Sequence, residues 1–134
     1  MSTTTIEHVF ESGRAYSPPG WPDRVRPPGV PEWEASAAAY LLDCCPADFR
    51  AYRVLRNHPV VLAQFARQFV EGQAQAAQDG LAAARTGLHD FVDASVLEEA
   101  AQAWLEQSAR LARTRRAVAL VEEALRGRTF VPKI

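Results

Sequence analysis

The chain has 134 residues, a formal net charge of −1 and 48% hydrophobic residues, and alanine supplies 24 of these. This length gives room for one folded domain. The near-neutral charge provides no overall attraction to nucleic acid or to a membrane surface. No apolar run reaches membrane-spanning length, and the first ten residues lack the basic and apolar segments of a secretory signal. We therefore expect a cytoplasmic protein without a membrane span.

Two copies of Pro-Pro-Gly-x-Pro, at residues 18–22 and 27–31, stand near the start of the chain. Proline fixes φ and keeps the residue before it out of the helical region. Residues 1–31 are therefore predicted to form an extended, proline-rich arm with turns at its two glycines. Proline-rich segments with aromatic residues can dock into a partner's groove, which makes Trp21, Pro22 and the nearby Trp33 candidate partner-binding residues. The alternative is an arm that wraps its own body.

Two short helices are predicted after the arm. The first should begin near Pro31-Glu32 and reach about Leu42, since proline and acidic residues suit a helix N-terminus. The second should begin at Pro46 and end near Asn57, before His58-Pro59.

A long helix is predicted from Pro59 onward. An apolar stripe steps alternately by four and three residues, as expected for one face of a helix. Its members are Val70, Ala74, Ala77, Leu81, Ala84, Leu88 and Phe91. The stripe crosses Gly80 without a change of phase, which favours one continuous helix, although a break at Asp79-Gly80 remains the alternative.

A second long helix is predicted to start at a capping box, Ser95 to Glu98, and to stop at Gly127. Glu106 with Arg110, and Glu122 with Arg126, are spaced for ion pairs along this helix. The short connection before it makes the two long helices antiparallel neighbours. The fold predicted is therefore all-α: two short helices followed by a long antiparallel αα-hairpin, with an extended Pro-rich N-terminal arm. The helical domain would span residues 32–134.

Basic residues gather on the last helix. Between residues 107 and 134 there are seven basic side chains against two acidic ones. Arg110, Arg113 and Arg116 are three residues apart and lie on one side of a helix. Such a row could select an acidic partner or hold phosphates, so these arginines are candidate partner-binding residues, with nucleic acid as the alternative ligand. A solvated helix face would look the same in the sequence.

No cofactor, metal site or catalytic group is predicted. The adjacent Cys44 and Cys45 make a poor chelate and an unfavourable disulfide. The three histidines are far apart in the sequence and are not spaced toward a nucleophile. A metal or metalloid sensor that uses the cysteines with His58 is a distant alternative.

The sequence thus favours a non-enzymatic cytoplasmic adaptor or scaffold. It would act through the Pro/Trp arm and the helical hairpin, on another protein whose identity the sequence does not give. A two-helix hairpin leaves apolar positions to cover, so we also expect a homodimer with coiled-coil-like packing. The alternative is a nucleic-acid-associated regulator that uses the arginine row. The arginine and alanine usage is typical of a bacterial chain.

Overall fold

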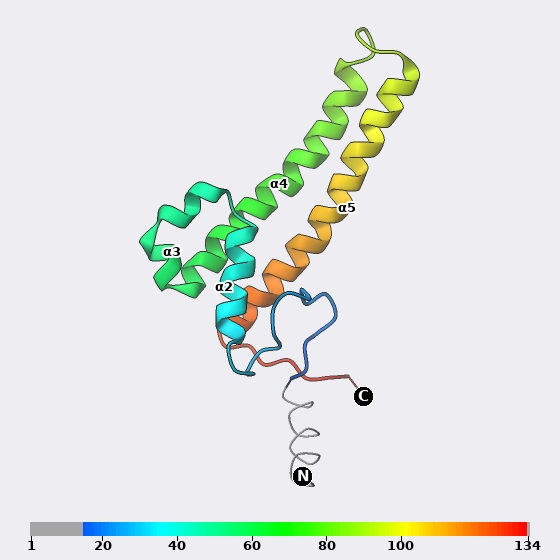
Figure 1. The fold of residues 1–134 in the computed structure, drawn as a ribbon. Coiled ribbons are helices and arrows are strands. Elements are labelled where there is room, and N and C mark those ends of the chain that lie inside the picture. The colour runs from blue at the N-terminus through cyan, green and yellow to red at the C-terminus, as the bar shows by residue number, and fades with distance from the viewer. Residues whose placement is uncertain (1–14, 134) are drawn as a thin grey trace.

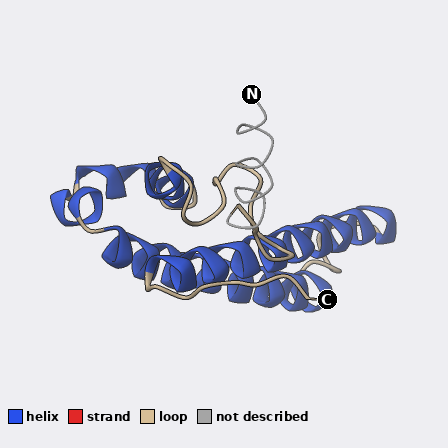
Figure 2. Ribbon diagram, turned by 90° about the horizontal axis from the view of Figure 1, so that it is seen from below, coloured by secondary structure: helices blue, strands red, loops and turns tan. Residues whose placement is uncertain are grey.

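The computed structural model describes residues 15–133, and within them it contains helices and loops but no strand (Figures 1 and 2). The helices in chain order are α2 (Trp33–Asp43), the short 3₁₀ helix η1 (Ala47–Ala51), α3 (Arg53–Asn57), α4 (Pro59–Gly87) and α5 (Ala94–Leu125). The all-helical fold and the long pair of packed helices are thereby confirmed. The predictions for residues 1–14 and for residue 134 lie outside the described residues.

Helices α4 and α5 form an antiparallel hairpin that dominates the molecule (Figure 1). At 29 and 32 residues they are each about 45 Å long. The predicted stripe places Val70, Ala77 and Ala84 in buried positions on α4. Helix α4 continues through Gly80, so the alternative of a break there is wrong.

The far end of the stripe was predicted wrongly. Helix α4 ends at Gly87, and Phe91 lies in the connecting turn with 82% of its surface exposed. The backbone must reverse direction between Gly87 and Ala94, so residues in that turn leave the helical phase that would bury them. The amide of Phe91 and that of Val92 both donate to the Leu88 carbonyl, which closes the turn.

Helix α5 begins two residues earlier than a Ser95 cap requires. The N-cap is Asp93, whose carboxylate accepts hydrogen bonds from the Val96 amide at 3.0 Å and the Ser95 hydroxyl at 2.8 Å. These bonds hold the pKa of Asp93 below its ordinary value. The predicted capping box at Ser95 is therefore wrong, because a carboxylate two residues upstream satisfies the first amides.

The short helices differ from the predictions at their ends. Helix α2 starts at Trp33, because Pro31 and Glu32 occupy a turn closed by the Trp33 amide and the Val30 carbonyl, with Glu32 at φ 68°. Residues 46–57 are not one helix. Extended backbone at Tyr52 separates η1 from α3, and Phe49 on η1 packs edge-to-face on Phe65 and Phe69 of α4.

Residues 15–32, here called the N-terminal loop, are turns rather than an extended arm. Each Pro-Pro-Gly-x segment closes one turn: the Trp21 amide donates to Pro18, and the Val30 amide donates to Pro27. In each turn the second residue is a proline and the third is a glycine with positive φ, Gly20 or Gly29. This is the pattern of a type II turn. The prediction of an extended conformation is corrected here, because each repeat encodes a reversal.

The core lies at one end of the hairpin, which we call the base. There α2, α3 and the N-terminal loop pack on α4 and α5 (Figure 1). The buried members of this core are Val25, Ala37, Leu41, Leu55, Leu62, Ala63, Ala66, Val70, Val118 and Val121. The rest of the hairpin extends beyond the base as two helices alone.

Candidate interaction surfaces

The aromatic residues singled out in the sequence pack on their own body. The Trp21 ring lies 6.4 Å from that of Trp33 and 6.0 Å from that of Phe130, and its indole N–H donates to the Val25 carbonyl at 2.9 Å. Val25 itself is only 3% exposed. Pro22 begins the next turn of the same loop. Trp21 and Trp33 are thus brought together, in a cluster that joins the loop to the C-terminal tail, residues 126–133.

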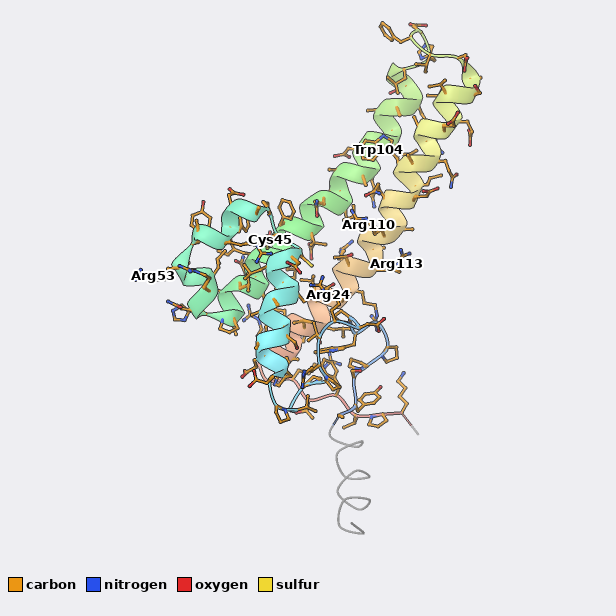
Figure 3. All side chains as sticks on the ribbon, viewed as in Figure 1. Arg24, Cys45, Arg53, Trp104, Arg110 and Arg113 are labelled. Atoms are coloured by element: carbon orange, nitrogen blue, oxygen red, sulfur yellow. The ribbon has the colours of Figure 1, made fainter. Side chains whose placement is uncertain are left out.

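The three candidate arginines do not form one surface. Arg116 donates to the Pro19 carbonyl at 3.0 Å and runs alongside Gly20, so it fastens the N-terminal loop to α5. Arg110 donates to Gln107 rather than to Glu106. Arg113 is exposed and has no hydrogen bond or ion pair within residues 15–133. Figure 3 shows Arg113 on α5 above the loop, whereas Arg110 lines a hollow beside Cys44 and Cys45.

A cavity of about 580 Å³ separates the N-terminal loop from the tail. Its walls combine prolines and aromatics of both segments with two arginines. They are formed by Tyr16, Pro18, Pro19, Arg116, Leu120, Arg128, Phe130, Val131 and Pro132, among others. The Arg128 guanidinium lies 4.9 Å from the centre of the Phe130 ring. Phe130 in turn packs on Trp21, which holds the tail against the N-terminal loop.

A second, more polar hollow contains the cysteine pair. Residues of α2, α4 and α5 enclose about 410 Å³ beside Cys44, Cys45 and Arg110. Both thiols are unpaired, and burial raises the pKa of each, that of Cys45 to about 11. At the rim, Asp43 accepts from both Arg24 and Arg50, and these bonds lower its pKa. The hollow therefore holds neutral thiols beside a charged carboxylate that is paired with two arginines.

Histidine does not join this hollow. His58 occupies the N-cap position of α4 without a side-chain capping hydrogen bond, and His89 lies at the far end of the hairpin beside Asp90. Within the described part of the chain, no group of three His, Cys, Asp or Glu side chains could hold a metal ion.

The far end of the hairpin carries an apolar patch, and two of its residues, Leu88 and Phe91, were predicted to lie on the apolar stripe of the long helix. We call residues 88–96 the tip. Besides Phe91, it exposes 37% of Leu88 and 44% of Val96. The tip lies well away from the base (Figure 1). Gly87 followed by His89-Asp90 was the signal for a turn at this point, because glycine ends helices and polar residues favour turns.

Charge is distributed unevenly along the hairpin. Residues 71–107, which form its outer half, contain seven acidic side chains against one arginine. Residues 108–133 contain seven basic side chains against two acidic ones. Figure 3 shows that the outer half has no other element beside it, so this acidic half faces solvent on most sides.

None of the helices within residues 15–133 combines the length and the apolar character needed to cross a membrane. Comparisons of the chain with models of known protein families, with curated proteins and with solved structures found no match.

Proposed function

We propose that this chain is a non-enzymatic cytoplasmic adaptor or scaffold that binds another protein through the tip of its hairpin. The observation that carries the proposal is the exposure of Phe91, Leu88 and Val96 together at the end of a projecting arm. Soluble proteins rarely expose several large apolar side chains in one place unless the patch binds a partner. Aromatic residues are also the commonest anchors of protein interfaces.

The Pro/Trp segment has a supporting role in this proposal. The indole N–H of Trp21 is already bonded to Val25, and its ring already packs on Trp33 and Phe130. A side chain with these contacts stabilises the base from which the hairpin projects. The proposed partner surface is therefore the tip of the hairpin, and the Pro/Trp segment supports the base.

The charge pattern favours a protein partner over nucleic acid. A phosphate backbone near Arg110 and Arg113 would run beside the acidic outer half of the same hairpin. Like charges repel there, and Arg116 already donates to Pro19. Nucleic-acid binding needs several convergent phosphate contacts. The proposal includes self-association as a homodimer, because the outer half has no second layer of helices.

The test is affinity capture from lysate of the source cell, with wild-type chain and with a Phe91→Ser, Leu88→Ser variant as bait. The proposal predicts a defined protein that the wild type retains and the tip variant loses. Val131→Ser is the matched control, since Val131 is an exposed apolar residue, 74% accessible, on the tail rather than the tip. Far-UV circular dichroism checks that each bait is folded.

Each capture is repeated with nuclease. A defined protein recovered with and without nuclease supports the adaptor. Material recovered only without nuclease, and lost with Arg113→Glu rather than with the tip variant, would overturn the proposal in favour of the nucleic-acid regulator.

A further inference from the structure

We propose that the outer face of α5 binds the same face of a second copy of this chain, with the two α5 helices antiparallel and crossing a two-fold axis at residue 107. The inference deepens the homodimeric part of the proposed function and rests on it. It concerns a surface separate from the tip.

The outer face of α5 is a regular row of exposed positions next to the side that packs on α4. Its members are spaced alternately by four and three residues, which keeps them on one side of a helix. They are Glu98, Gln102, Leu105, Ala109, Ala112 and Arg116, all exposed in the single chain. The buried Ala101, Leu111 and Val118 lie on the neighbouring side of α5, toward α4. Ala112 and Arg116 of the row line a hollow together with residues of α4. The centre of the row is apolar and the two ends carry opposite charges.

The row has the symmetry that a two-fold pairing requires. In an isologous antiparallel contact, residue i of one copy faces residue j of the other, and j faces i. Glu98 with Arg116, Gln102 with Ala112, and Leu105 with Ala109 share one midpoint, position 107. Leu105, 42% exposed, would then be covered by the Ala109 side of the second copy, and alanine allows two helices to approach closely.

Charge selects the antiparallel orientation. The first part of α5, residues 94–107, has three glutamates and no basic residue, whereas residues 108–125 have four arginines and two glutamates. A parallel pair would place like charges together. An antiparallel pair places Glu98 opposite Arg116, and on one flank it places Glu99 near Arg113. The Arg116 guanidinium has five N–H donors, so its bond to Pro19 leaves donors for a carboxylate.

A second copy fits this face better than an unrelated charged partner. A uniformly acidic protein would match the arginine half and be repelled by the glutamate half, and a basic protein would do the reverse. Only a partner with both signs in the reverse order satisfies the whole row, and the chain itself supplies such a sequence. Complementary charge of this kind fixes register and partner choice.

The experiment is sedimentation equilibrium of the full chain at low and at high salt. We expect a wild-type dimer. Arg113→Glu and Glu99→Arg should each weaken the dimer at least about tenfold, because each change brings like charges together across the axis. The double variant, Glu99→Arg with Arg113→Glu, should restore dimerisation. These residues are fourteen positions apart on one helix, too far for the restoration to arise within one chain.

Arg53→Glu is the matched control. It makes the same charge change at an exposed residue of α3, away from α5 (Figure 3), and should leave the dimer unchanged. A monomeric wild type would overturn the inference while leaving the tip test of the proposed function intact. A dimer insensitive to both single variants, or a double variant weaker than either, would show that this face is not the contact.

Discussion

At the scale of single residues, the cysteine pair shows how burial decides chemistry. Cys44 and Cys45 lie where α2 ends, half-buried against residues of α4 and α5. Burial disfavours the thiolate, and for Cys45 the charge of the neighbouring Cys44 thiolate adds to this effect. A nucleophilic or metal-binding cysteine needs the thiolate form. The two thiols are therefore unreactive and contribute to packing.

This gives a prediction for their reactivity. At pH 8 a thiol with a pKa of about 11 holds on the order of a hundredfold less thiolate than one with the ordinary value near 8.5. Iodoacetamide should therefore modify Cys45 at least tenfold more slowly in the native chain than in the chain unfolded in urea. The rate should rise as pH approaches 11. Mass spectrometry of timed samples measures both rates. Equal rates would mean that the thiol is accessible and normally acidic.

Ion pairs at this scale were only partly predictable. The spacing of Glu122 and Arg126 correctly predicted a pair, observed at 3.0 Å. Glu122 is also buried and faces Arg67 of α4 at 2.9 Å, a partner 55 residues away that no local spacing reveals. Arg110 bonds Gln107 although its spacing from Glu106 favours a pair. Local spacing predicts which pairs can form, and tertiary packing and competing acceptors determine which do.

At the scale of elements, one close contact between α4 and α5 joins a glycine to a tryptophan. A Cβ placed on Gly80 would lie 2.5 Å from the Trp104 ring, so the indole packs directly on the α4 backbone. Glycine normally weakens a helix. Here it permits a close approach of a large aromatic ring, which is why α4 tolerates it in mid-helix.

Gly80→Ala should therefore destabilise the chain, by about 1–3 kcal/mol, because the methyl group would displace the Trp104 ring. Gly72→Ala is the matched control on the same helix, since a Cβ there meets no atom within 4 Å. It should instead stabilise the chain by about 0.5–1 kcal/mol, the helix propensity difference. Urea unfolding followed by circular dichroism measures both. If both variants changed the free energy of unfolding in the same direction, the close contact between Gly80 and Trp104 would be contradicted.

Interiors of elements were predicted better than their ends. The apolar periodicity correctly predicted that α4 continues through Gly80, because an apolar stripe keeps its phase only along an unbroken helix. The start of α5 depended on a choice between two capping residues, Asp93 and Ser95, two positions apart. The break at Tyr52 follows from the packing of Phe49 on α4, a contact between segments that periodicity within either segment cannot predict.

At the scale of the whole molecule, the chain is a packed base with a thin projecting arm. The buried aliphatic side chains larger than alanine lie in the base or the adjacent half of α5. Farther out, the buried positions are alanines: Ala77, Ala84 and Ala101. Alanine buries little area, so the outer half of the hairpin gains less from its own packing than the base does.

The N-terminal loop should therefore contribute to global stability. Trp21→Ala removes a half-buried ring that contacts Trp33 and Phe130, and the Nε1 hydrogen bond to Val25. We expect a loss of about 2 kcal/mol or more in the free energy of unfolding, seen as a lower urea midpoint. Phe91→Ala removes a similar ring from an exposed position and should change the midpoint little. An unchanged midpoint for Trp21→Ala would show that the loop is not part of the base.

The candidate site could be predicted only in part from the sequence. The hairpin followed from periodicity and a short connection. The tip did not, because the stripe extended past Gly87 and assigned Leu88 and Phe91 to the core. The three arginines were placed correctly on the last helix. Arg116 is set apart from the other two because it binds the N-terminal loop. The loop and Arg116 are separated by most of the sequence, and a local sequence pattern does not predict a contact between such distant residues.

The hydrogen bond between Pro19 and Arg116 joins residues 97 positions apart, and Trp21 packs on Phe130, close to the C-terminus. The surfaces that receive the N-terminal loop are therefore synthesised after it. Contacts of such long sequence separation form late in folding. During translation the loop emerges before α5 and the tail, so Trp21 has no surface to pack on until they follow. The loop can therefore reach its native position only after α5 and the tail have been made.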